Sequence, residues 1–165
     1  MNFFELLWAY LLVFIFSAIP LFEAYAVIPI AIVAGLSPIL VVIIGLSGNI
    51  LTVFLLILFI EKIKEWRNKI KKNKKQKATN KRSLRAEKLW KRYGLIGLTL
   101  IGPLLVGSHL TSFMSLVFGG TKTKTLYWMI ISITMWSLLF SILTYFGVNM
   151  FLPESDGFLN KYFNN

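Results

Sequence analysis

Three polar side chains that lie in long apolar stretches are the residues of this sequence best suited to chemistry. The first is Glu23, the only charged residue between residues 6 and 60. An acidic residue at the centre of a bilayer costs about 2.5 to 3.5 kcal/mol, so it is retained there chiefly for a function or beside a partner. A carboxyl in such a place can take up and release a proton. We therefore predict that Glu23 is a proton or substrate site.

His109 and Asn49 are the two further candidates for the same site. His109 is the only histidine, and it follows Ser108 in a second apolar stretch. An imidazole there can relay a proton or contact substrate, although a lone histidine more often has a structural hydrogen bond. Asn49 can bind substrate or form a hydrogen bond between helices. Both interpretations stay open for each residue.

The residues around Glu23 predict a backbone that is interrupted inside the membrane. A proline removes a backbone donor and disfavours helix for the residue before it, so Ile19-Pro20, Ile28-Pro29 and Ser37-Pro38 are predicted breaks. Broken backbone at bilayer depth is tolerated only where protein or a water-filled cavity satisfies its polar groups. The residues predicted to shape such hairpins in the two halves of the chain are Pro20, Pro29, Gly35, Pro38, Gly48, Pro103 and Gly107.

Residues 6–60 have room for two full crossings and part of a third, because one crossing takes about 20 residues. The alternatives are three short crossings, two long crossings, or a re-entrant hairpin followed by one crossing. The prolines favour the last, with the crossing at residues 39–60. On that helix Gly45, Asn49 and Thr52 share one face, where another helix could approach closely.

A basic segment at residues 61–92 separates the two apolar halves. It carries 15 of the 18 Lys and Arg residues and so accounts for most of the net charge of +11. An excess of Lys and Arg beside membrane spans assigns a loop to the cytoplasm, where it also attracts anionic lipid. Helical character returns at residues 84–93.

Residues 93–121 are predicted to form a second interrupted segment, around Pro103 and Gly107. Lysines and arginines flank it on both sides, which favours a second re-entrant hairpin; the alternative is one tilted crossing with a proline kink. Residues 125–152 form a clear span. A stripe of hydroxyl side chains on that span is made by Thr134, Ser137, Ser141 and Thr144.

The order of hairpin and span therefore recurs in the two halves, as in transporters built from inverted repeats. At residue level the only match is short: Ile19-Pro20-Leu21 against Gly102-Pro103-Leu104. We predict an all-α polytopic membrane protein with a repeat of re-entrant hairpin plus transmembrane helix. The expected parts are 1–60, membrane half one; 61–92, basic cytoplasmic loop; 93–152, membrane half two; and 153–165, a short tail.

Composition supports the membrane class and argues against several others. The chain is 56% hydrophobic over 165 residues, with a mean hydropathy of +0.69. It has no cysteine and none of the common hydrolase or nucleotide-binding motifs. We expect no enzyme activity, no cofactor, no metal site and no nucleic-acid partner. Membrane lipid, a small-molecule or lipid substrate and a second copy of the chain are the partners that we consider.

Several residues of the first half resemble the small multidrug export protein family, which is related to the DedA-like membrane proteins. The residues that carry the resemblance are Pro20, Glu23, Ile28-Pro29, Gly35, Pro38 and Gly48-Asn49. The resemblance implies a membrane transporter. The wider DedA-like group is associated with proton-dependent transport, including flipping of a polyprenyl phosphate lipid, and uses an arginine in the second hairpin. This chain has no arginine between residues 93 and 121.

The sequence departs from the family in two further places. Family members often carry an arginine shortly after the glutamate, where this chain has Ala24 and Tyr25, and a Pro-x-Pro-Gly-like run in the second hairpin, where this chain has residues 102–105 as Gly-Pro-Leu-Leu.

The function expected from residues and resemblance together is transport. We expect a small inner-membrane transporter, with proton coupling as one form, that exports an amphipathic or cationic small molecule or flips a lipid. The alternative is a non-transporting membrane scaffold or lipid-binding module in which Glu23 only sets the geometry of a hairpin.

The charge pattern predicts a topology in which both termini lie outside and residues 61–92 lie in the cytoplasm. Single cysteines at Asn2, Lys75, Lys122 and Asn164 can be probed in intact cells with an impermeant thiol reagent. We expect labelling at Asn2 and Asn164 only. Labelling of the Lys122 position from outside would replace the second hairpin by a single crossing, and labelling of the Lys75 position would invert the topology.

Overall fold

The computed structural model describes residues 2–60, 62 and 81–151, and within this part the chain is helical with no strand. The helices are α1 (Phe3–Ala18), α2 (Ala24–Val33), α3 (Pro38–Leu58), α5 (Lys81–Val106), α6 (Ser108–Val117) and α7 (Lys122–Phe151). The predicted all-α class is confirmed. The first part of the basic segment and the tail at residues 153–165 lie outside the described residues.

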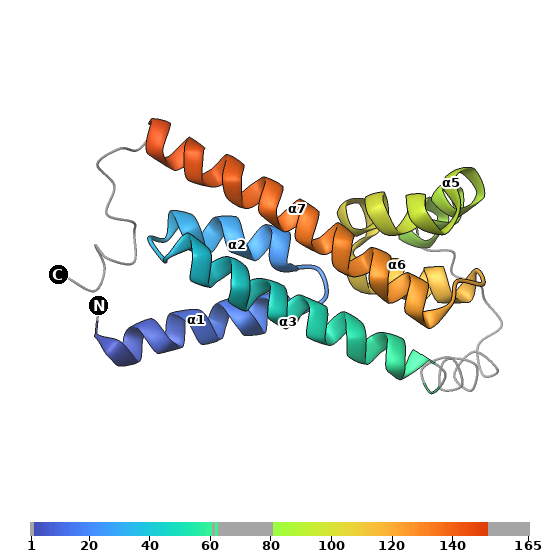
Figure 1. The fold of residues 1–165 in the computed structure, drawn as a ribbon, viewed down its shortest axis with the longest axis horizontal. Helices are drawn as coiled ribbons and strands as arrows, with labels where there is room; N and C mark the ends of the chain where they lie inside the picture. Colours follow the sequence, from blue (N-terminus) through green and yellow to red (C-terminus); the bar gives the residue numbers. More distant parts are fainter. Residues whose placement is uncertain (1, 61, 63–80, 152–165) are drawn as a thin grey trace. The chain divides into compact units, whose positions relative to one another are not determined.

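Two compact units make up the chain. One contains Met1–Leu51 and Ile133–Asn165, and the other contains Thr52–Ser132. In the first unit α1 and α2 run in opposite directions side by side (Figure 1). In the second unit α5 and α6 pack against each other. Each unit therefore contains one pair of packed helices joined by a short turn.

Among the described residues, three helical stretches are long and apolar enough to cross a membrane, by length and composition: Pro38–Leu58, Leu84–Val106 and Lys122–Val148. The second of these includes a backbone break at Gly94 and so is not one continuous helix. The predicted single helices at residues 39–60 and 125–152 are confirmed by α3 and α7. The helices of the first hairpin are shorter. α1 has 16 residues and α2 has 10, or about 24 and 15 Å at 1.5 Å per residue, against about 30 Å of hydrocarbon.

The second apolar half begins with a sharp turn at Gly94. Its backbone has φ 64° and ψ −156°, so α5 is two helices, residues 81–93 and residues 95–106. A positive φ of this kind is accessible to glycine at little cost. The apolar part of α5 is therefore about 18 Å long.

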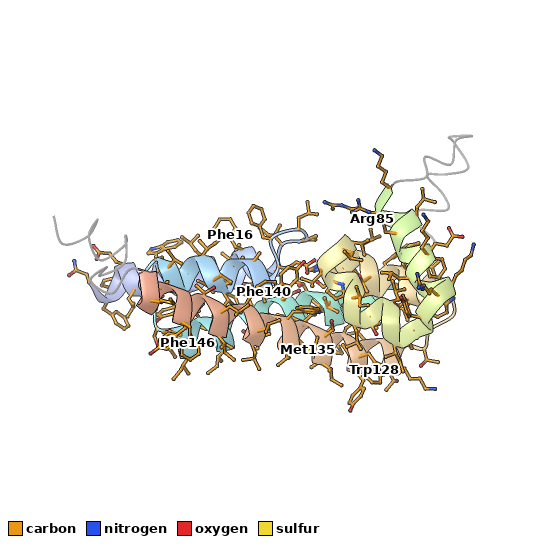
Figure 2. The ribbon with its side chains drawn as sticks, turned by 90° about the horizontal axis from the view of Figure 1, so that it is seen from above. Phe16, Arg85, Trp128, Met135, Phe140 and Phe146 are labelled. Carbon is orange, nitrogen blue, oxygen red and sulfur yellow. The ribbon has the colours of Figure 1, made fainter. Side chains whose placement is uncertain are left out.

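Figure 2 shows the side chains, many of which project from the outer surface of the helices. Phe16 of α1 and Met135 and Phe146 of α7 are labelled there and are exposed. Large apolar side chains on the outside of α1, α3 and α7 are what a lipid-facing surface requires.

The predicted break at Ile28-Pro29 is wrong, because α2 continues through Pro29 to Val33. A proline inside a helix forfeits one backbone hydrogen bond, here to the carbonyl of Tyr25. Buried apolar side chains hold the helix together on both sides of the proline: Val27 and Ile28 before it, and Ala31 and Ile32 after it. The other two prolines of this half lie where predicted, Pro20 in the turn after α1 and Pro38 as the first residue of α3.

α2 and α6 are the second helices of the two hairpins, and they have the same length and similar backbone conformations at both ends. α2 and α6 both have 10 residues. The residue before α2 is Glu23 (φ 50°, ψ 155°), and the residue before α6 is Gly107 (φ 97°, ψ 149°). Both helices end at a glycine with positive φ, Gly35 at 95° and Gly119 at 108°.

The hydrogen bonds that close the two helices also correspond. Leu36 N donates to Ala31 O at 3.1 Å, and Gly120 N donates to Ser115 O at 2.9 Å; each is the six-residue closure typical of a glycine C-cap. Residues 23–38 thus match residues 107–122 with a constant offset of 84. This register corrects the alignment of Pro20 with Pro103, because Pro20 lies in a turn whereas Pro103 lies inside α5.

Close backbone approach to α1 limits the size of the residue at position 48 on α3. A Cβ atom at Gly48 would lie 2.5 Å from the carbonyl oxygen of Phe14, a backbone atom that cannot move aside alone. A Cβ atom at Gly147 on α7 would meet no heavy atom within 4 Å in the described structure.

We therefore expect Gly48→Ala to destabilise the folded protein by about 1–3 kcal/mol through overpacking. Gly147→Ala is the matched control and should be neutral or stabilising, by up to about 1 kcal/mol, because alanine favours helix. Thermal unfolding in detergent measures both. Equal unfolding temperatures for the two variants would show that α1 and α3 do not approach each other as described.

Candidate functional site

Glu23 lies at the turn of the first hairpin, immediately before α2. Its exposed fraction is only 1%, although the turn residues just before it, Leu21 and Phe22, are well exposed. Its backbone has φ 50°, in a region that a side chain with a Cβ atom rarely adopts. Such a conformation costs about 1–3 kcal/mol and is concentrated at functional sites. The chain thus holds a buried carboxyl at a position where glycine would be less strained, as Gly107 shows in the other hairpin.

The unit that contains Glu23 also contains a cluster of aromatic side chains, which includes Tyr25, two residues further along the sequence. The ring of Tyr25 on α2 lies 6.2 Å from that of Phe140 on α7, and Phe140 stacks with Trp136 at 6.1 Å between ring centroids. These rings pack α2 against the second part of α7. Aromatic faces also attract cations, at about 0.5–2 kcal/mol per contact.

Asn49 is fully buried on α3, among small residues that bring the neighbouring helices close. One turn earlier, a Cβ atom at Gly45 would lie 2.9 Å from the side chain of Ile28 on α2 and 3.2 Å from the Ser17 hydroxyl on α1. The predicted close approach on this face of α3 is confirmed for Gly45. Asn49 is therefore placed inside the protein, and whether it binds substrate stays a prediction.

His109 is the second residue of α6, and hydroxyl groups lie beside both of its ring nitrogens. Nε2 lies 3.0 Å from Thr52 Oγ1 on α3, and Nδ1 lies 3.3 Å from Ser108 Oγ. A hydroxyl can donate or accept, so either tautomer of the neutral ring can be satisfied. The structure brings His109 together with Thr52, which is 57 positions away in the sequence. Glu23 and Asn49 belong to the other unit.

The buried face of α6 is lined by hydroxyl groups. Ser108, Thr111, Ser112 and Ser115 are all fully buried, and in the register described above they replace Ala24, Val27, Ile28 and Ala31 of α2. Ser112 Oγ donates to Ser108 O at 2.8 Å. The hydroxyls of Thr111 and Ser115 have no hydrogen-bond partner among the described residues. Sequence inspection missed this face, although its members recur with helical spacing, at intervals of three and four residues.

The hydroxyl stripe that was predicted on the last span lies on the inner side of α7. Ser137 and Ser141 are buried, and Thr134 and Thr144 are half-buried. In the second unit a further serine of α7, Ser132, donates from Oγ to Leu100 O of α5 at 3.0 Å. Buried hydroxyls on α7 thus include one that joins two helices through a backbone carbonyl.

Apolar spans, helical hairpins and polar groups buried among them define this chain as a multi-pass membrane protein. A family model described as "Putative small multi-drug export protein" matches residues 23–139, about 70% of the chain, and the chain therefore belongs to that family. The match begins at Glu23 and runs through α2, α3, α5, α6 and much of α7. Comparison with curated proteins and with solved structures gives no match.

We expect Thr52 and His109 to be coupled in stability. His109 is buried and Thr52 is partly buried, so Thr52→Val and His109→Phe, which each remove the contact between them, should each destabilise the protein. Their double variant should cost less than the sum, with a coupling of about 0.6 kcal/mol and at most about 1.7 kcal/mol, the range for hydrogen bonds between membrane helices.

Chemical unfolding of the four proteins in detergent measures the coupling, and Thr52→Ser is the control that keeps the hydroxyl. Strict additivity of the two single variants would mean that the Thr52 hydroxyl and the ring do not interact.

Proposed function

We propose that this protein is a small inner-membrane exporter of cationic amphipathic molecules, coupled to proton movement through Glu23. The family supports export as the activity. The observation that carries the proposal is the burial of the Glu23 carboxyl at a strained hairpin turn. A group in that place serves a coupled transporter well, because it can hold a proton or a cationic substrate in turn.

The surroundings of Glu23 support a cation as the substrate. Tyr25 is two residues from Glu23 in the sequence, and its ring lies 6.2 Å from that of Phe140 on α7, which stacks with Trp136. An amphipathic cation is attracted by both features, through its charge and its apolar body. The second hairpin carries no arginine between residues 93 and 121. Flipping of an anionic lipid headgroup is therefore the less supported form of transport.

We propose that both hairpins are re-entrant and that the two halves form an inverted repeat, which would relate the chain to the DedA-like proteins. The short lengths of α1, α2 and α6 and the matched ends of α2 and α6 support this arrangement. The proposed topology is that of the charge pattern, with the basic segment at residues 61–92 in the cytoplasm and both termini outside. Transporters of this kind bind substrate where interrupted segments of the two repeats meet.

Within this proposal His109 and Asn49 have different roles. His109 with Thr52 and Ser108 forms a short chain of groups that can each give and take a hydrogen bond. Such a chain suits proton relay. Asn49, buried on the closely packed face of α3, suits the positioning of helices around the substrate path.

We expect Glu23→Gln to remain folded and inserted but to lose export driven by a proton gradient. Glutamine has nearly the shape of the neutral acid and cannot release a proton. Glu23→Asp should keep part of the activity with a shifted pH profile. Glu5→Gln is the matched control, since Glu5 lies at the start of α1 and should be replaceable without effect on transport.

The measurement is uptake of a fluorescent cationic dye into inside-out vesicles with an imposed pH gradient, together with thermal stability of each purified variant. Unchanged gradient-driven uptake in Glu23→Gln would exclude Glu23 as the coupling site. If Glu23→Gln fails to fold and the wild type shows no gradient-driven uptake, the two results together would favour a scaffold in which Glu23 is a structural partner.

A further inference from the structure

The helix at residues 81–93 has one strongly cationic face. Lys81, Arg85, Lys88 and Arg92 are spaced at i, i+4, i+7 and i+11, which places them in one row along a helix. All four are exposed, and Figure 2 shows the side chain of Arg85 extending away from α5. We call these four residues the cationic row. The carboxylate of this helix, Glu87, is off the row and pairs with Lys91 at 2.7 Å.

The opposite face of the same helix packs on the second hairpin. Ala86 is fully buried in an apolar cluster with Leu98 and Val106, and Leu89 and Trp90 pack against that cluster. The ring of Trp90 lies 5.5 Å from that of Phe118, the residue at the end of α6. The apolar side of this helix is thus already covered by protein, and its cationic row faces outward.

The chain after Gly94 keeps the cationic row close to the membrane. Residues 95–106 form the apolar part of α5, and the row lies 2 to 13 residues before Gly94, the residue that precedes this membrane segment. At 1.5 Å per residue this is a distance of about 3–20 Å along the helix. Attraction between exposed charges extends over about 8 Å at physiological ionic strength. The end of the row nearest Gly94 is therefore within this range of the apolar part of α5.

We propose that the cationic row binds the phosphate groups of anionic phospholipids and holds the second hairpin against the membrane surface. The helix carries six cationic side chains and one carboxylate, a net charge of +5. Juxtamembrane cations of this kind are attracted to anionic leaflets. Because the apolar face packs on protein, the contact is electrostatic and shallow. It differs from the insertion of an amphipathic helix, in which the apolar face enters the lipid.

Binding at the row acts on the hairpin through Trp90. The lipid contacts hold residues 81–93, and these contact α6 near Gly119 through the pair Trp90 and Phe118. Anionic lipid should therefore stabilise the second hairpin. This inference concerns a lipid-binding surface and does not depend on transport or on Glu23.

The test uses the complete protein reconstituted in vesicles with the same lipid in both leaflets, so that orientation does not matter. The chain has no cysteine, and Leu84 is exposed between Lys81 and Lys88, so Leu84→Cys can carry an environment-sensitive fluorophore. In vesicles of phosphatidylcholine with phosphatidylglycerol we expect blue-shifted emission and protection from iodide. Both should be absent in pure phosphatidylcholine and in about 1 M salt, where the Debye length falls to about 3 Å.

Two double variants of equal charge separate the row from charge in general. Arg85→Gln with Lys88→Gln removes two cations from the row, and the ratio of bound to free helix should fall about thirtyfold, at about 1 kcal/mol per cation and 1.4 kcal/mol per factor of ten. Lys122→Gln with Lys124→Gln removes two exposed cations outside this helix and should retain the shift. Trp90→Ala should keep the lipid response of the fluorophore but abolish the extra thermal stability that phosphatidylglycerol gives.

Three results would overturn the proposal. One is the same emission in both kinds of vesicle. Another is an equal loss of the shift in the two double variants. The third is a full response to inorganic phosphate in phosphatidylcholine vesicles, which would identify a site for a free anion instead of a membrane surface.

Discussion

Inside a bilayer, backbone N–H and C=O groups must be satisfied by the protein itself, and the two short hairpin helices depend on this constraint. α2 and α6 are only 10 residues long, so their terminal groups are a large share of the total. Gly35 and Gly119 close the carboxyl ends with the same hydrogen-bond pattern. At the amino ends Glu23 and Gly107 enter the helix with positive φ. The first turn of each helix therefore points its free N–H groups at the tip of its hairpin.

The two hairpins use one backbone design for different chemistry. The buried positions of α2 are apolar, and its polar group is the carboxyl at the turn. In α6 the same positions carry hydroxyls, the turn residue is Gly107, and the ionisable group is His109, two residues later. A carboxyl at the amino end of a helix is favoured by the helix dipole, whereas a histidine there is favoured in its neutral form. The two hairpins thus differ in their ionisable group, which is a carboxyl in the first and an imidazole beside two hydroxyls in the second.

Much of this fold follows from the apolar runs of the sequence and from the prolines that interrupt them. The long apolar runs predicted α3 and α7, and Pro20 and Pro38 marked a turn and a helix start. The break predicted at Pro29 was wrong, because helix propensity describes an isolated helix. In the folded protein, buried side chains on both sides of the proline stabilise α2. The backbone match between residues 23–38 and 107–122 was not found in the sequence, because only Val33 and Gly35 are identical to their counterparts, Val117 and Gly119. The backbone angles at the ends of α2 and α6 show a correspondence that the side-chain identities do not show.

Contacts between distant helices could not be predicted in the same way. Nothing in the sequence pairs Thr52 with His109, since many hydroxyls lie near the histidine and only packing selects one. The sharp turn at Gly94 was also missed: a glycine near aromatic and basic residues is common, and its positive φ depends on how residues 81–93 pack on α6. Glu23 and Asn49 stood out in the sequence because a polar group in an apolar run is rare. Both are buried, and their part in a site stays a prediction.

Packing between these helices has little help from hydrophobicity, because lipid covers apolar surface as well as protein does. Many large apolar side chains on α1, α3 and α7 are in fact exposed. The folded arrangement must then depend on close contact and on polar pairs. Gly45 and Gly48 admit neighbouring helices, Gly102 lies against Thr111, and Ser132 donates to a carbonyl on α5. Because each such contact is worth little alone, the arrangement of these helices depends on many weak contacts acting together.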